Sequence, residues 1–254
     1  MTTRAVDLSQ RQAALVAGFA LLAMAILSLF FNFFVLEDLI VSGDAATTAN
    51  NILASEGLFR VGVASILVVI VLDVVAAWAL YEFLKPVNGS LALLTAWFRL
   101  VFATVFGVAV LNLFLALELV EGDGYLAVLD PTQVHAQMLF FLEAFDYGWL
   151  IGLVLFGLHL AGLGYLVLRS GYVPRVLGVL LIAAALGYLI DSFAHFLLSN
   201  YDDYETVFLL VVAVPGVVGE LSFAVWLLAK GGKGQPRDNR ALGSASLVPG
   251  AASG

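Results

Sequence analysis

Cysteine is absent from this chain, and charged residues are scarce. The lack of cysteine excludes disulfides, thiolate metal sites, iron–sulfur clusters and cysteine nucleophiles. Asp, Glu, Lys and Arg make up only 12% of the 254 residues, whereas soluble domains contain about 25%. These two scarcities exclude an ordinary soluble enzyme, and any chemistry must use oxygen, imidazole or amide groups.

Apolar residues make up most of the sequence. They amount to 62% of the chain, the mean hydropathy is +1.04, and they lie in long blocks without the alternation of membrane strands. A helix needs about 20 mostly apolar residues to cross the bilayer core. The sequence therefore predicts an all-α polytopic membrane protein, a bundle of six transmembrane helices at about 13–36, 57–85, 90–119, 137–168, 174–199 and 206–229.

Basic residues predict the orientation, because short cytoplasmic loops retain Lys and Arg. One set of loops and both chain ends carry Arg4, Arg11, Lys85, Arg169, Arg175, Lys230, Lys233, Arg237 and Arg240. The opposite loops carry only acids, which are Glu37, Asp38, Asp44, Glu56, Glu121, Asp123, Asp130, Asp202, Asp203 and Glu205. Both termini are predicted to be cytoplasmic.

The segments outside the spans have their own signals. We expect a cytoplasmic segment at 1–12, the transmembrane domain at 13–230 and a flexible tail rich in Gly, Ser, Ala and Pro at 231–254. Asp44 is a predicted N-cap for a short helix in the first outer loop. Asp130 and Pro131 predict that the fourth span begins outside the lipid.

Charged side chains at membrane depth usually face a bundle interior and mark function. Counting residues from the loops gives an inner layer, in which Asp73 and Arg99 lie at equal depth on adjacent antiparallel helices and should pair. His159 and Glu220 fall at comparable depth. A purely structural lock between two helices remains an alternative for the pair.

A predicted outer layer contains Glu143 and Asp146 on the fourth span and Asp191 and His195 on the fifth. Each pair shares a helix face. We expect Arg60 and Tyr188 to complete this constellation. Because the acids outnumber the bases, the layer predicts protonated carboxyls, a bound cation, a cationic substrate or a metal, with a hydrogen-bonded network between helices as the alternative.

Some sites are excluded or weakly indicated. His159 and His195 lie about 16 Å apart in depth, so we expect no haem shared between them. Asp191, His195, Glu143 and Asp146 are candidate metal ligands, but their spacing lacks a recognised signature. Pro215-Gly216 in the sixth span indicates either a kink or a discontinuous helix. Glycines 148, 152, 157, 162, 164, 178 and 187 predict close packing of the fourth and fifth spans.

Several motifs resemble the prokaryotic membrane family called domain of unknown function 4386. The resemblance covers about residues 10–230 and implies a six-helix integral membrane protein, with no activity attached. It rests on Phe59-Arg60, Asp73, Leu80-Tyr81, Leu84-Lys85-Pro86-Val87-Asn88, Ser90-Leu91-Ala92-Leu93-Leu94, Phe98-Arg99-Leu100, Tyr147-Gly148, Leu150-Ile151-Gly152-Leu153, Phe156-Gly157-Leu158-His159, Leu163-Gly164-Tyr165-Leu166, Arg169-Ser170-Gly171-Tyr172, Pro174-Arg175 and Leu186-Gly187-Tyr188-Leu189-Ile190-Asp191-Ser192-Phe193.

Three functions fit this sequence. The leading hypothesis is an interior that binds or translocates a small solute or ion through the two layers. The second is a membrane-embedded hydrolase of lipid near the outer leaflet, with a metal that activates water. The third is a non-catalytic sensor or assembly subunit. The expected partners are the lipid bilayer and a second copy of the chain, with no nucleic acid, and the expected location is the cytoplasmic membrane of a prokaryote.

Overall fold

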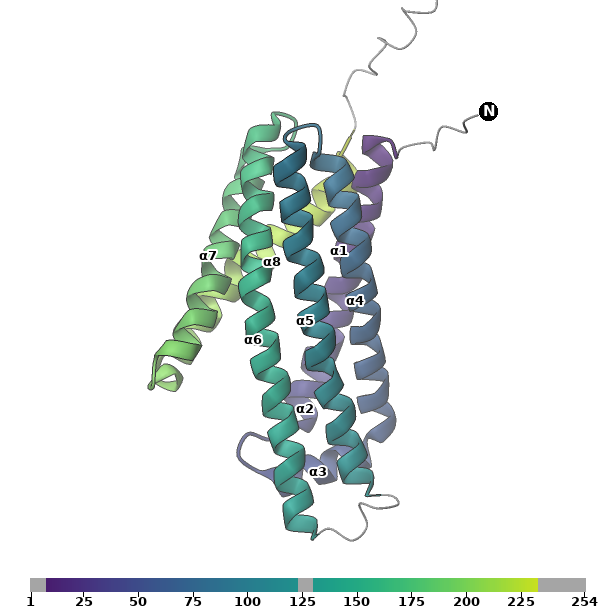
Figure 1. Cartoon of the computed structure of the whole chain (residues 1–254), viewed down its shortest axis with the longest axis vertical. Helices are drawn as coiled ribbons and strands as arrows, with labels where there is room; N and C mark the ends of the chain where they lie inside the picture. Colours follow the sequence, from purple (N-terminus) through teal and green to yellow (C-terminus); the bar gives the residue numbers. More distant parts are fainter. Residues whose placement is uncertain (1–7, 123–129, 233–254) are drawn as a thin grey trace, which may run out of the picture.

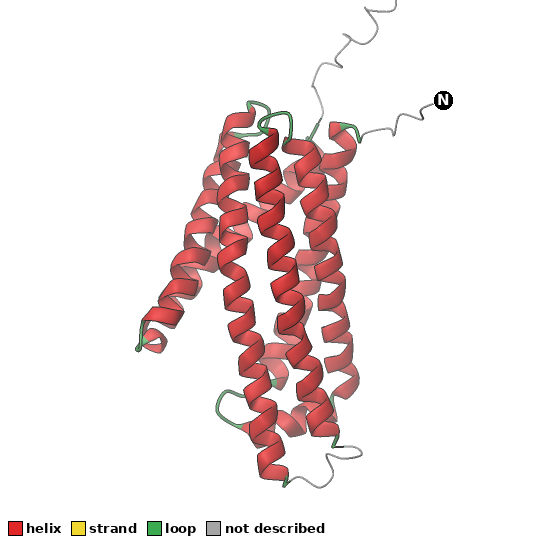
Figure 2. Ribbon diagram, viewed as in Figure 1, coloured by secondary structure: helices red, strands yellow, loops and turns green. Residues whose placement is uncertain are grey.

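The structure is a computed structural model that describes residues 8–122 and 130–232. Six helices in this part are long and apolar enough to cross a membrane, which makes the chain a multi-pass membrane protein. Figure 2 shows helices joined by loops throughout the described residues. The helices are α1 (Gln10–Phe31), α2 (Glu37–Leu39), α3 (Ala45–Ala54), α4 (Glu56–Leu84), α5 (Gly89–Glu121), α6 (Pro131–Ser170), α7 (Arg175–Leu197) and α8 (Glu205–Ala229).

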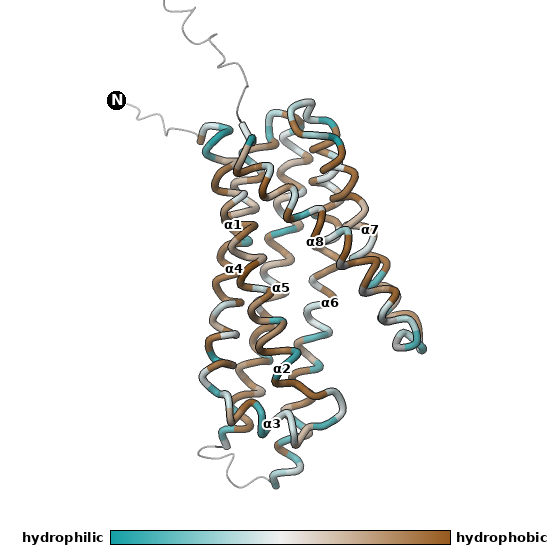
Figure 3. The backbone as a smooth tube through the Cα atoms, turned by 180° about the vertical axis from the view of Figure 1, so that it is seen from behind, coloured by the Kyte–Doolittle hydropathy of each residue, from teal (hydrophilic) through white to brown (hydrophobic). Residues whose placement is uncertain are grey.

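The spanning helices form a ring. Each packs on its neighbour in chain order, and α8 returns to pack on α1. Apolar residues cover these helices, as the brown tube in Figure 3 shows. We call the end with the α4–α5 and α6–α7 turns the inner end, and the end with α2 and α3 the outer end. Figure 1 shows that α7 and α8 diverge from α6 toward the outer end and stop short of it.

Helix length explains this difference in extent. The 40 residues of α6 span about 60 Å and the 23 residues of α7 about 35 Å at 1.5 Å per residue. Only the second length matches a hydrocarbon core of about 30 Å. The outer ends of α5 and α6, with α2 and α3, therefore extend beyond the level of the α7 tip.

Two predicted helix starts are confirmed. The carboxylate of Asp44 accepts from the Thr47 amide at 2.9 Å and caps α3. Asp130 accepts from the Thr132 amide at 2.9 Å, and Pro131 is the first residue of α6. Hydrogen bonds from the Thr47 amide and hydroxyl lower the pKa of Asp44 below its usual value. Each cap stabilises the first turn of a helix at the outer end.

Glycines allow α6 to pack closely on its neighbours. The sequence predicts α7 as the partner, and the structure shows close contacts with both α7 and α5. Gly164 of α6 and Gly178 of α7 meet so closely that a Cβ on Gly164 would lie 2.8 Å from the Gly178 carbonyl oxygen. Gly148 and Gly152 instead face α5, against Ala109 and Phe102. Glycines at 3- or 4-residue intervals fit any neighbouring helix, so the sequence could not assign the partner.

Two features depart from regular α-helix sequence or geometry. Residues Asn32–Leu36 after α1 form a π-helical segment, a feature that is frequent at functional sites. Pro215 lies inside α8, which continues unbroken from Glu205 to Ala229. The discontinuous-helix interpretation of Pro215-Gly216 is therefore wrong for the described chain.

Candidate functional site

An ion pair lies inside the ring at the depth that the sequence predicts. Arg99 donates from Nη2 to Oδ1 of Asp73 at 2.7 Å, and each side chain is 3% exposed. Asp73 lies 11 residues before the end of α4 and Arg99 lies 10 residues after the start of α5. Both are therefore about 15 Å from the inner end, and the predicted pairing is confirmed.

His159 is the second partner of Arg99. The Nη1 group of Arg99 lies 3.1 Å from Nε2 of His159, and Nδ1 of His159 lies 2.9 Å from the Thr95 carbonyl oxygen. A guanidinium only donates hydrogen bonds and a carbonyl only accepts them. These contacts assign the proton to Nδ1 and leave a neutral imidazole. Both ring nitrogens are occupied, so His159 supports Arg99 and is not free to ligate a metal or haem.

Glu220 of α8 and Tyr188 of α7 form the other side of the inner layer. The Tyr188 hydroxyl donates to Oε1 of Glu220 at 3.3 Å. Gly216 leaves room for this hydroxyl, because a Cβ at that position would lie 3.1 Å from it. The sequence placed Tyr188 in the outer layer, which differs from the structure. Side chains lean toward the N-terminus of their helix, and the N-terminus of α7 is at the inner end.

A cavity of about 490 Å³ joins the inner layer to one residue of the outer layer. It lies within the ring and receives residues from α1, α4, α5, α6, α7 and α8. Asp146, 24 residues from the inner end of α6, lines its outer part at a depth of about 36 Å. Its polar lining consists of Ser28, Asn32, Asp73, Arg99, Asp146, Tyr188 and Glu220.

Aromatic rings form a continuous wall along this cavity. Ring centroids lie 4.5 to 6.3 Å apart in successive contacts that lead from Phe31 through Phe145, Phe106, Trp149, Phe102 and Phe156 to Tyr188. Sequence reasoning missed this wall. The signal was present, since Phe145, Trp149 and Phe156 recur on one face of α6 and Phe102 and Phe106 on one face of α5.

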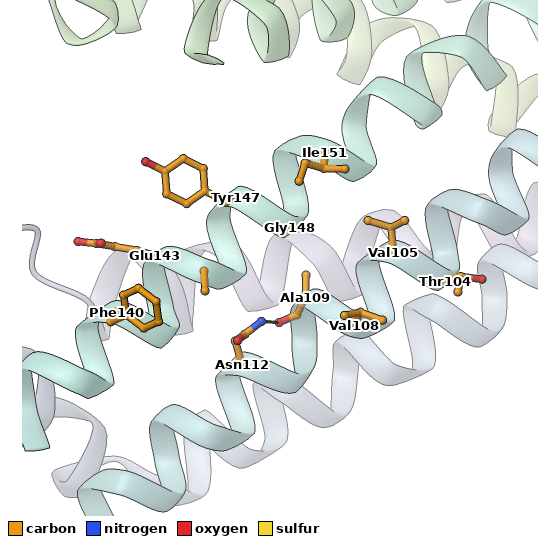
Figure 4. Close-up of a pocket in the computed structure, with 11 residues that line it drawn as sticks. Thr104, Val105, Val108, Ala109, Asn112, Phe140, Glu143, Tyr147, Gly148 and Ile151 are labelled. Atoms are coloured by element: carbon orange, nitrogen blue, oxygen red, sulfur yellow. Dashed lines mark hydrogen bonds between the residues drawn. The ribbon is translucent and has the colours of Figure 1, made fainter. Parts of the chain in front are cut away.

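The rest of the predicted outer layer does not converge. Asp191 accepts a hydrogen bond from the Tyr201 hydroxyl at 2.6 Å, and the His195 ring contacts Tyr147 and Tyr201. Glu143 lines an apolar groove of about 500 Å³ between α5 and α6, where Figure 4 shows its carboxylate pointing away from Ala109 and Asn112. Depth counts do not show which neighbour a side chain faces, and these side chains have different partners.

Arg60 also lies apart from the other predicted site residues. Its guanidinium pairs with Glu56 at 2.6 Å and with Glu121, and its side chain is 51% exposed. It therefore links the outer ends of α4 and α5 instead of facing Asp191. Among residues 8–122 and 130–232, no three His, Asp or Glu side chains gather closely enough to hold a metal ion.

The inner end of the cavity is closed by packing and hydrogen bonds. Arg11 of α1 donates to the carbonyl oxygens of Leu227, Leu228 and Gly231 at 2.7 to 3.1 Å. The Tyr172 hydroxyl donates to the Phe83 carbonyl oxygen at 2.9 Å. Burial raises the pKa of Tyr172 to about 12. The Phe83 ring contacts the rings of Tyr172 and Trp226, and none of these three residues lines the cavity.

Comparison with known proteins gives a family match and a similar protein, but no structural match. The family described as Domain of unknown function (DUF4386) matches residues 16–231. An uncharacterized protein of Archaeoglobus fulgidus is 32% identical over 171 residues, which cover 67% of this chain and 84% of that protein. No solved structure matches the chain.

Proposed function

Since this chain belongs to the family described as Domain of unknown function (DUF4386), whose description gives no activity, we propose a function from the cavity itself. The cavity between the Asp73–Arg99 pair and Asp146 binds a small solute or ion, which the protein holds or translocates. The observation that carries the proposal is a cavity of about 490 Å³ with ionisable groups along its length. Ligand pockets commonly have 300 to 1,000 Å³, mostly apolar walls and a few convergent polar groups.

The proposal includes the placement of the protein. The distribution of Lys and Arg supports an inner end and two termini in the cytoplasm, with the chain in the cytoplasmic membrane. The cavity then faces the outer side and is sealed toward the cytoplasm. The transmembrane domain at 13–230, its flanking segments and a homodimer also belong to this proposal.

Isosteric cysteines test the placement, because the natural chain has none. Ser42→Cys lies in the outer loop and Ser90→Cys in the first turn of α5, and both serines are exposed. In intact cells, a membrane-impermeant maleimide should label Ser42→Cys and should label Ser90→Cys only after the cells are opened. The reverse pattern would place the cavity toward the cytoplasm.

Native mass spectrometry tests the binding itself. Ser28 lines the cavity, and Ile26 on the same helix is 61% exposed and outside the cavity lining. The wild-type protein and Ile26→Trp should retain a bound mass that Ser28→Trp lacks, because the tryptophan fills the cavity. Identical spectra for the three proteins, with only protein and lipid masses, would count against the proposal.

A further inference from the structure

We propose that the ligand is an amphiphilic organic cation that reaches the cavity sideways from the membrane. This inference rests on the proposed function and specifies its substrate class. Three features of the cavity carry it: the balance of charges, the aromatic wall and the position of the mouth.

The charges in the cavity are unbalanced toward acid. Asp73 and Arg99 neutralise each other at 2.7 Å, and His159 contributes no charge with both nitrogens hydrogen-bonded as described. Two carboxyl groups then remain, Glu220 and Asp146, and neither has an ion-pair partner within hydrogen-bond distance among the described residues. A ligand that carries one positive charge balances this excess, whereas an anion increases it.

The aromatic wall favours an organic cation over a metal ion. Cations lie over ring faces within about 6 Å of the centroid, an attraction used to recognise quaternary ammonium groups. The wall already holds one cation in this manner, because the Arg99 guanidinium lies 5.4 Å from the centroid of Phe156. A bare metal ion would instead need several oxygen or nitrogen ligands gathered at one point.

The mouth of the cavity has an apolar rim at membrane depth. The lining residues Leu29 of α1 and Val217 of α8 are 50% and 54% exposed. They lie 19 residues from the start of α1 and 12 residues from the end of α8, or about 29 and 18 Å from the inner end. This range falls within a hydrocarbon core of about 30 Å. A ligand that enters here must dissolve in the bilayer, which requires an apolar body around its charge.

Calorimetric titration with tetraphenylphosphonium tests the substrate class, with tetraphenylborate as an anion of the same shape. The protein is used full length in detergent, and titrations into empty micelles are subtracted. We expect saturable binding of the phosphonium and none of the borate. Comparable binding of both ions, or binding of the borate alone, would overturn the inference.

Variants then locate the binding. Glu220→Gln should weaken phosphonium binding about tenfold or more, because it removes a desolvated countercharge, and Asp146→Asn should weaken it severalfold. Glu118→Gln is the matched control, since Glu118 is exposed near the outer end of α5 and does not line the cavity. If Glu220→Gln fails to fold, the exposed Asp146 still provides the test. Unchanged affinity in Asp146→Asn and in any folded Glu220→Gln overturns the inference.

The two proposals fail in distinguishable ways. A bound mass that Ser28→Trp loses, combined with no phosphonium binding, would reject the organic cation and keep the solute site. No bound mass and no phosphonium binding would reject both. Phosphonium binding that Ser28→Trp abolishes and Ile26→Trp retains would support both.

Discussion

The inner and outer halves of this bundle differ in how their polar groups are held. In the inner half, Arg99 is bonded to both Asp73 and His159 between tightly packed helices. In the outer half, Asp146 faces a cavity and Arg60 is exposed. The comparison indicates that the buried Asp73–Arg99 pair maintains the structure, whereas the cavity that extends outward from this pair to Asp146 admits a ligand. Each prediction below tests one side of it.

The largest effect should follow from breaking the buried pair. Arg99→Gln leaves the Asp73 carboxylate buried without its partner, which costs about 3 to 5 kcal/mol of stability. Unfolding in mixed micelles should show this loss, and Asp73→Asn combined with Arg99→Gln should cost less than the sum of the single changes. Arg60→Gln is the outer control and should produce no resolvable change, because its ion pairs are exposed. Equal effects in the two halves would contradict the comparison.

The glycine contacts of the inner half should be the next most sensitive. Gly178→Val inserts a Cβ that would lie 2.9 Å from the Gly164 carbonyl oxygen, and such overpacking costs about 1 to 3 kcal/mol. Gly57→Ala is the outer control, since no atom lies within 4 Å of the added Cβ. Thermal unfolding followed by circular dichroism should show a loss for the first variant and none for the second.

The fold was largely predictable from the sequence, because the positions of membrane-spanning helices, turns and caps depend on local composition. Asp44 and Asp130 were identified as caps from their neighbours alone. The Asp73–Arg99 pair was also predictable, since a tight turn fixes the relative depth of two antiparallel helices. The arrangement of the outer layer was not predictable. Asp191 and His195 both contact Tyr201, which follows α7, and nothing in the sequence indicated this partner.

Alkaline pH should loosen the seal at the inner end. The pKa of Tyr172 is raised from its ordinary value of 10.0 to about 12, so its contribution to stability is complete below pH 10 and is lost as pH rises toward 12. Its hydrogen bond to Phe83 contributes about 1 kcal/mol. Tyr172→Phe should therefore be less stable than the wild-type protein at pH 8, and its stability should depend less on pH between pH 10 and 12. An unchanged alkaline sensitivity in melting temperature would disprove this role.

Acid pH should produce the smallest effect, at the outer cap. The pKa of Asp44 is lowered from its ordinary value of 3.8 by the Thr47 amide, so its stabilising effect is complete above that value and is lost as pH falls through the lower folded pKa. Hydrogen exchange in α3, corrected for intrinsic rates, should accelerate at low pH. In Asp44→Ala the exchange should be fast throughout, and a persisting pH dependence would show that another group controls α3.

Accessibility of a single cysteine in the cavity tests the central difference between the halves. Ser28 lines the cavity, whereas Ser192 of α7 is fully buried and does not. N-ethylmaleimide, a neutral thiol reagent that dissolves in the bilayer, should modify Ser28→Cys in intact cells, leave Ser192→Cys unmodified, and react more slowly in the presence of tetraphenylphosphonium. A Ser28→Cys protein that resists the reagent as Ser192→Cys does would contradict an open cavity in the outer half.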